Sequence, residues 1–295
     1  MPDILNLTIQ QTINGVVMGC LYVMVALGLT LIYGVMNQIN FAHADFVTLG
    51  GFAAYFFVQW VGGAYLLSIV VALFTGALLG YLINLTIFAP LRERGDELRP
   101  LIATIGVSVL LENGALLAFG PVPYQFNSPY DETIRFGKIF FTSQSLLVVI
   151  VASSTIAGLY LFMKYTFTGK ALRAISQDRE TAGLMGINQK FLIMLTIVIA
   201  SAMAGMAGAM LGPILVLTPF AGASVIVKSF AIVIIGGFGN MAGTIIAGLL
   251  VGLIEAFTTQ YLGSGVIDLV VFALLLVMLL VKPTGLVAEK KEENV

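Results

Sequence analysis

Residues 167–190 read FTGKALRAISQDRETAGLMGINQK, and long apolar runs lie on both sides of this charged stretch. Its charged side chains are Lys170, Arg173, Asp178, Arg179, Glu180 and Lys190. A charged side chain at the centre of a bilayer costs several kcal/mol, about 3 on insertion scales. The stretch must therefore lie in water, and the apolar runs must be arranged to place it there.

The same stretch has helical character. Apolar residues at 172, 175, 184 and 187 can form apolar faces, while residues 178–180 are polar. Gly169 opens the stretch, and Gly183 and Gly186 are residues of the kind that end or break a helix. We predict a short helix, a turn and a second short helix.

Composition predicts an all-α, polytopic helical membrane protein. Hydrophobic residues make up 59% of the 295-residue chain and charged residues only 10%, against about 25% charged in soluble domains. The mean hydropathy is +1.02. The net charge of -1 does not suggest a nucleic-acid partner, and one Cys with one His makes a metal site unexpected. We expect no cofactor.

Nine apolar runs predict eight or nine membrane spans. They cover residues 13–36, 45–61, 64–90, 101–120, 145–164, 191–217, 225–238, 241–260 and 264–281. Most approach the ~20 residues that cross a ~30 Å hydrocarbon core. The run 225–238 is short and contains Lys228, so we predict a half-span or broken helix that lines a cavity.

Basic residues predict the orientation. If all nine runs cross in succession, 11 of the 14 Lys and Arg residues share one side. These are Arg92, Arg94, Arg99, Lys164, Lys170, Arg173, Arg179, Lys190, Lys282, Lys290 and Lys291. Arg135, Lys138 and Lys228 then fall on the other side. The positive-inside rule places the 11 in the cytoplasm and the N-terminus outside. If 225–238 does not cross, the C-terminus changes side.

This topology predicts one transmembrane domain over residues 1–295. A four-span unit (13–120) precedes a linking span and the cytoplasmic stretch (145–190). A second four-span unit (191–281) has the opposite orientation, and a cytoplasmic tail (282–295) follows. Two units of opposite orientation form an inverted repeat, a common plan in transporters. This prediction depends on topology alone.

Glycines recur one helical turn apart, at 15/19, 76/80, 208/212 and 248/252. Small residues with this spacing let helix backbones approach closely, so we predict that they serve packing. The sequence GGFGN at 236–240 separates two apolar runs, and we expect the backbone to unwind there.

Five polar residues lie in or beside apolar runs and are candidates for a substrate pathway. They are Asn40, His43, Asp45, Glu112 and Asn113. Structural roles are the alternative: a hydrogen-bonded histidine, an aspartate capping the next helix, and an asparagine satisfying a turn. Glu112 can bind a substrate ammonium, be protonated, or pair with another helix.

Two motifs resemble known families. Glu180-Thr181-Ala182 followed by Gly186 resembles the loop by which permease subunits of ABC importers dock into their ATPase subunits. The family pattern has a proline further on, whereas the next proline here is Pro213. This resemblance implies a coupling role for seven residues of the stretch. They are Gly169, Lys170, Arg173, Asp178, Glu180, Ala182 and Gly186.

Residues 28–55, GLTLIYGVMNQINFAHADFVTLGGFAAY, resemble branched-chain amino acid permeases of the LivH type. Tyr33-Gly34, Asn40–His43, Asp45 and Gly50 match, and Ala44 stands where the family commonly has Gly. Residues 100–121, 169–188, 233–255 and 282–286 also resemble the family, so the likeness extends essentially from end to end.

The resemblance implies a fold like that of type II ABC importers and transport of Leu, Ile and Val across the bacterial inner membrane. It implies three kinds of partner: two ATPase subunits, an identical or homologous second permease, and an extracytoplasmic solute-binding protein. The string 168–171 lacks the glycine spacing and the following Ser/Thr of a phosphate loop, so we expect no enzyme activity in this chain. The alternatives are a permease for urea or short amides, an ion-coupled secondary transporter, and a membrane scaffold.

Overall fold

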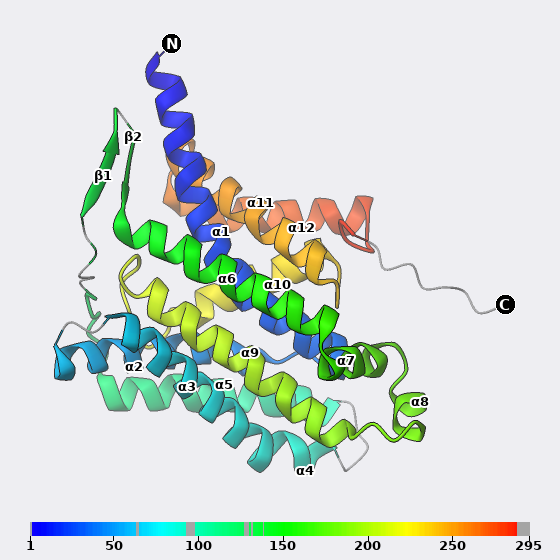
Figure 1. The fold of residues 1–295 in the computed structure, drawn as a ribbon. Coiled ribbons are helices and arrows are strands. Elements are labelled where there is room, and N and C mark those ends of the chain that lie inside the picture. The colour runs from blue at the N-terminus through cyan, green and yellow to red at the C-terminus, as the bar shows by residue number, and fades with distance from the viewer. Residues whose placement is uncertain are drawn as a thin grey trace.

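A computed structural model describes residues 2–62, 65–92, 98–126, 130, 132–137 and 139–287. Within these residues the chain is a helical bundle (Figure 1). Its first helices are α1 (Pro2–Met36), the 3-10 turn η1 (Phe41–His43), α2 (Asp45–Val61), α3 (Tyr65–Ile83), the π-helical turn η2 (Asn84–Phe88), α4 (Ala89–Arg92) and α5 (Leu98–Phe119). The strands β1 (Thr133–Phe136) and β2 (Ile139–Thr142) follow. The remaining elements are α6 (Ser143–Tyr165), α7 (Phe167–Gln177), α8 (Arg179–Leu184), α9 (Gln189–Leu211), α10 (Ala221–Gly236), α11 (Met241–Tyr261), η3 (Ser264–Val266) and α12 (Ile267–Val281).

The predicted spans are confirmed as helices. Eight helical segments in the described part of the chain are long and apolar enough to cross a membrane. The ninth run forms α10, which at 16 residues is shorter than the rest. Helices α1 and α9 are largely buried and form the core, whereas α5, α6 and α12 are mostly exposed, as lipid-facing or partner-facing helices must be.

The prediction of an all-α fold missed one element. Strands β1 and β2 form an antiparallel hairpin with Thr133 opposite Thr142 and Phe136 opposite Ile139. It projects beside the N-terminal end of α1 (Figure 1), where the backbone N–H of Phe140 donates to the Gln10 side chain. The prolines and charges of this loop obscured the short alternation of the strands.

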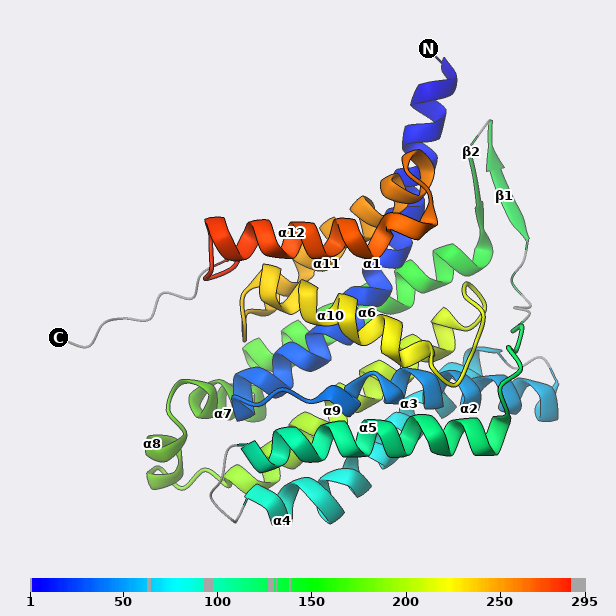
Figure 2. The same ribbon diagram turned by 180° about the vertical axis from the view of Figure 1, so that it is seen from behind.

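Contacts between distant segments show which segments meet at each end of the bundle, and they are those expected if consecutive spans cross in opposite directions. At one end, the N–H of Leu286 donates to the carbonyl of Ile235, and Gly34 lies against Gly239. At the other end, the side chain of Gln11 donates to that of Gln260. Figures 1 and 2 show α7, α8 and the last turn of α12 away from the hairpin. Helix α10 therefore ends at the same end of the bundle as α7, and the C-terminal segment shares that end.

Basic residues gather at that same end. Lys164, Arg173 and Lys282 lie there, and Arg92 is near Arg179. Arg135 lies on the hairpin at the opposite end. Arg94, Lys138, Lys290 and Lys291, with residues 288–295 of the predicted tail, lie outside the described residues.

The predicted glycine packing is confirmed where α1 crosses α11. A Cβ atom added to Gly252 would lie 2.4 Å from the backbone N of Gly19 and 2.5 Å from the carbonyl O of Gly15. Only glycine permits this approach, because such separations are far below van der Waals contact. Gly208 similarly lies against the backbone of Val47 on α2. The small residues thus bring the first and last parts of the chain together.

Helices α2 and α10 both begin inside the bundle after irregular segments, 37–44 and 212–220. Their N-termini meet: the N–H of Gly222 donates to the Thr48 hydroxyl at 2.8 Å, and Gly222 packs on the carbonyl of Ala44. Each is the second span of its predicted four-span unit. Interrupted helices at matching positions of two repeats are the arrangement that transporters use at their binding sites.

Candidate functional site

The charged stretch forms two short helices, as predicted. Helix α7 begins after Thr166, whose hydroxyl accepts a hydrogen bond from the N–H of Gly169. Its buried face includes Leu172 and Ile175, and it contacts α6, α1 and α9. A Cβ atom on Gly169 would lie 2.3 Å from the carbonyl O of Phe162, so glycine lets α7 pack closely on the end of α6. Helix α7 is therefore attached to the transmembrane bundle through side-chain packing.

Asp178 joins the two helices. It ends α7, and its carboxylate caps α8 by accepting hydrogen bonds from the N–H groups of Glu180 and Thr181, each at 3.0 Å. The hydroxyl and N–H of Thr181 lower the pKa of Asp178 below its ordinary value. The cap is therefore complete above the ordinary carboxyl pKa and is lost as the pH falls through the lowered value.

Gly186, rather than Gly183, ends α8. Gly186 has a φ of +82°, which favours glycine. The N–H of Ile187 donates to the carbonyl of Ala182, and that of Gly186 to the carbonyl of Gly183. These two bonds form a Schellman motif, which satisfies the last carbonyls of the helix. The spacing from Ala182 to Gly186 thus has a structural cause: it fixes the end of α8.

Several side chains of the two short helices remain exposed. Lys170, Arg173 and Glu180 are exposed, and Ala182 is buried. Of the apolar residues expected to form faces, Leu184 is 84% exposed, and its neighbour Met185 is 79% exposed. Two large apolar side chains at the tip of a charged loop are typical of a docking surface.

Among the pathway candidates, His43 and Asn40 lie in the irregular segment before α2, and both are buried. The Nε2 atom of His43 lies 3.1 Å from the carbonyl O of Val25, so it must donate. This leaves Nδ1 as an acceptor without a partner, like the buried amide nitrogen of Asn40. Gly28 makes room for the ring, since a Cβ there would lie 2.7 Å from His43.

Asp45 and Glu112 are brought together. Asp45 is 3% exposed, lies in the first turn of α2, and has Ser108 and Glu112 of α5 as its polar neighbours. Its Oδ2 atom has no hydrogen-bond partner, and no described residue forms an ion pair with it. Asn113 lies on the exposed side of α5, where its amide donates to the carbonyl of Val109. The structure therefore places two carboxyl groups from distant runs near each other, whereas Asn113 lies on the exposed side of α5.

Lys228, which the count of basic residues groups with Arg135, lies in a helix of the bundle and not in a loop. Lys228 lies within α10, and its Nζ atom is 2.7 Å from the carboxylate of Glu255 on α11 and 3.1 Å from the Tyr22 hydroxyl on α1. Both charged side chains are 13% exposed. We call these three residues the Lys228 cluster. The two charges are 27 residues apart, so the local sequence gave no signal of their pairing.

Comparison with known proteins identifies the family. Residues 11–280 match the family model described as "Branched-chain amino acid transport system / permease component". The chain belongs to this family. It is a multi-pass membrane protein and a transport permease component.

Named relatives agree over nearly their whole length. The chain is 34% identical to the high-affinity branched-chain amino acid transport system permease protein LivH of Escherichia coli (strain K12), covering 97% of both chains. It is 33% identical to the permease protein BraD of Pseudomonas aeruginosa, covering 100% of both. Among solved structures, PsaBC from Streptococcus pneumoniae in complex with Fab shares 15% identity at a TM-score of 0.47, covering 95% of this chain and 91% of that one.

Proposed function

We propose that this permease forms the transmembrane pathway of an ABC importer for branched-chain amino acids in the bacterial inner membrane. In this proposal two separate ATPase subunits hydrolyse ATP and dock on α7 and α8. A solute-binding protein delivers substrate at the opposite end, and a second permease, identical or homologous, completes the pathway.

The geometry of α7 and α8 carries this proposal. Helix α7 is tied to the bundle by its buried face, whereas the tip of α8 exposes Leu184 and Met185. Caps at Thr166, Asp178 and Gly186 fix both helices without a partner. We call α7 and α8 together the lever. Because the lever is rigid, exposes apolar side chains and is attached to the transmembrane helices, it can transmit movement of a docked subunit. The seven coupling candidates divide accordingly: Gly169, Asp178, Ala182 and Gly186 shape the lever, Lys170 and Glu180 are exposed, and Arg173 borders a cavity beside α1 and α6.

The test is reconstitution with the ATPase subunits and solute-binding protein in liposomes. We expect the double variant E180Q/G186A to hydrolyse ATP without matching leucine uptake, because docking contacts and the end of α8 are both altered. G158A is the matched control, since a Cβ at Gly158 meets no atom within 4 Å. Uptake per ATP equal to that of the unaltered permease in the double variant would overturn the coupling role.

We further propose that Asp45 and Glu112 receive the ammonium group of the substrate. Two carboxyl groups share a site inside the membrane-spanning part of the molecule without a cation from the described residues. A charge buried in this way requires a partner of opposite sign or a proton. A zwitterionic amino acid supplies the ammonium, whereas urea and short amides do not. Uptake of leucine that is competed by isoleucine but not by urea or acetamide is the expected result.

The ion-coupled alternative makes a different prediction from the same carboxyl groups. If Asp45 and Glu112 bind a coupling proton, leucine uptake will follow a proton gradient in liposomes that contain no ATPase subunits. Uptake only with the ATPase subunits and ATP supports the importer. Leucine uptake driven by the proton gradient alone would overturn the importer and support the ion-coupled transporter.

A further inference from the structure

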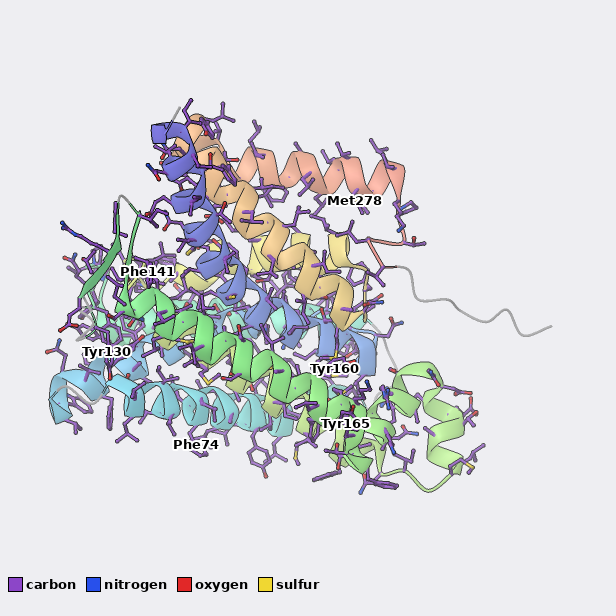
Figure 3. All side chains as sticks on the ribbon, turned by 45° about the horizontal axis from the view of Figure 1, so that its top comes forward. Phe74, Tyr130, Phe141, Tyr160, Tyr165 and Met278 are labelled. Carbon is purple, nitrogen blue, oxygen red and sulfur yellow. The ribbon has the colours of Figure 1, made fainter. Side chains whose placement is uncertain are left out.

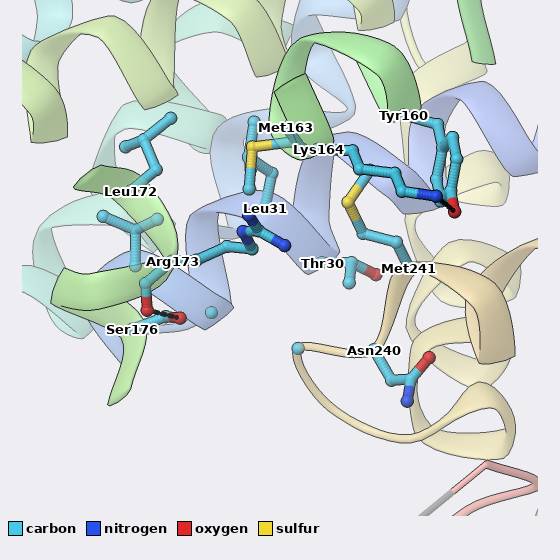
Figure 4. A pocket seen from close by; sticks show the side chains of 13 residues that line it. Thr30, Leu31, Tyr160, Met163, Lys164, Leu172, Arg173, Ser176, Asn240 and Met241 are labelled. Atoms are coloured by element: carbon cyan, nitrogen blue, oxygen red, sulfur yellow. Dashed lines mark hydrogen bonds between the residues drawn. The ribbon is translucent and has the colours of Figure 1, made fainter. Parts of the chain in front are cut away.

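A cavity of about 310 Å³ lies where the C-terminal halves of α1 and α6 meet α7 and the loop before α11. Figure 4 shows its lining. Thr30 and Leu31 come from α1, Lys164 from α6, Arg173 from α7, and Asn240 from the loop. Neither Asp45 nor Glu112 lines this cavity, and Arg173 is the one lining residue that the proposed function uses, as a coupling candidate.

The lining carries two positive charges and no carboxylate. Lys164 Nζ lies 3.5 Å from the Tyr160 hydroxyl, and no described acidic residue pairs with it or with Arg173. In Figure 4 the guanidinium of Arg173 extends past Leu31 toward Thr30 and Met241. The backbone before α11 also presents helix N–H groups at this edge, although Asn240 caps the N–H of Gly243. Two unpaired cations at a cavity of this size match an anionic group with several oxygen acceptors.

We propose that this cavity binds the phosphate-containing headgroup of an acidic phospholipid. The cavity lies at the end of the bundle where basic residues gather, which the positive-inside rule assigns to the cytoplasmic leaflet. Basic pockets between transmembrane helices on this side are suited to acidic lipid headgroups.

The surroundings favour a lipid over a soluble phosphate. Helix α6 is mostly exposed, and Tyr160 and Tyr165 at its end are 48% and 64% exposed. Figure 3 shows both tyrosines beside α7. Exposed tyrosines are typical of the headgroup level of a membrane, and the apolar face of α6 can accompany the acyl chains. Because Arg173 belongs to α7, a bound headgroup would join the coupling helix to the end of α6.

The test measures which lipids the full-length permease retains. The protein is purified from nanodiscs that contain equal amounts of phosphatidylglycerol and phosphatidylcholine, and bound lipids are counted by native mass spectrometry. We expect the unaltered chain to retain phosphatidylglycerol preferentially. We expect K164Q/R173Q to lower that preference roughly 25-fold, about fivefold for each cation removed. The matched control R135Q/K282Q removes the same charge outside the cavity and leaves the preference unchanged.

This experiment tests lipid binding independently of the proposed coupling to ATPase subunits, because no ATPase subunit is present. An equal preference in K164Q/R173Q and the unaltered chain would overturn the proposal. A second arm titrates inorganic phosphate against the same protein. Phosphate binding that depends on Lys164 and Arg173 without any preference among lipids would overturn the lipid as the ligand, whereas lipid retention that phosphate does not displace supports it.

Discussion

The Lys228 cluster and the Asp45–Glu112 pair both place carboxyl groups inside the membrane-spanning part of the permease, but only one of them is neutralised. Glu255 has an ammonium 2.7 Å away. Asp45 has a hydroxyl and a second carboxyl group as its polar neighbours. Both arrangements join helices that are distant in sequence. The Lys228 cluster pairs its carboxylate with a cation and can therefore anchor its helices permanently. The Asp45–Glu112 pair has no such cation among the described residues.

This difference supports our proposal that the Lys228 cluster serves structure and that the Asp45–Glu112 pair serves transport. Lys228 and Glu255 fasten the short helix α10 to α11, and Tyr22 adds a contact from α1. Asn40, His43 and Asp45 each retain a buried polar atom without a hydrogen-bond partner, and so does Glu255 at Oε2, but only Glu255 has a cation beside its carboxylate. Unsatisfied buried groups cost about 1–3 kcal/mol each, so they call for a ligand, water or a moving partner. A substrate would therefore gain the most binding free energy beside the segment before α2, because it could satisfy these buried polar atoms.

The largest effect is expected from breaking the anchor. K228M leaves the Glu255 carboxylate buried without its cation, and we expect a loss of about 3–5 kcal/mol in the free energy of unfolding. The double variant K228M/E255M removes both charges and should recover most of that loss. Denaturation in detergent measures both. A K228M protein as stable as the unaltered one would show that the pair is not an anchor.

The opposite pattern is expected at Asp45. D45N removes a charge that no described cation neutralises, so the unfolding free energy should stay unchanged or rise. Loss of a charged hydrogen bond to the substrate is worth about 1.5–3 kcal/mol, which corresponds to a roughly 10- to 100-fold weaker apparent affinity for leucine in reconstituted uptake. If D45N destabilises the protein and leaves leucine uptake unchanged, Asp45 has a structural role. The proposed difference between Asp45 and the Lys228 cluster would then be wrong.

A smaller effect is expected from displacing His43. G28A places a methyl group 2.7 Å from the imidazole ring, and overpacking of this kind costs about 1–3 kcal/mol. G158A adds the same methyl group to an open helix position and should stabilise slightly, by about 0.5–1 kcal/mol. Thermal unfolding of the two variants separates crowding at His43 from the general effect of alanine. Equal melting temperatures would mean that the ring moves aside freely.

The smallest effect on stability is expected at Asp178, which lies outside the membrane. D178N weakens the cap of α8 and leaves the transmembrane helices intact, so uptake per ATP should fall several-fold while the melting temperature hardly changes. The effect should resemble that of lowering the pH through the reduced pKa of Asp178, because both remove the carboxylate. If D178N kept the uptake per ATP of the unaltered permease, the cap of α8 would have no role in coupling.

Much of the fold was accessible from local pattern. The run 45–61 corresponds to α2, and 241–260 differs from α11 by one residue. The separation of α7 from α8 and the end of α8 at Gly186 follow from capping residues that act within a few positions of the chain. The coupling role proposed for residues of this stretch depends instead on the resemblance to a family motif. The β-hairpin was missed because four-residue strands leave little alternation to detect.

The polar contacts inside the bundle depend on helix pairing that the sequence does not specify. Nothing near Lys228 identifies Glu255, and nothing near Asp45 identifies Glu112, because the partners are brought together only when α10 packs on α11 and α2 on α5. The placement of Asn113 away from Asp45 has the same origin, since a helix turns adjacent residues by about 100° and packing decides which one faces inward.

The amino-acid sequence alone determined that the chain crosses a membrane many times, which stretch lies in water, and which family it resembles. Those properties depend on hydrophobicity, charge and short motifs, which act locally. Only the tertiary structure decided which buried charge is neutralised and which is not, where the two interrupted helices meet, and where two unpaired cations share a cavity. These are relations between residues tens or hundreds of positions apart, and they exist only once glycine-lined helices have packed against one another.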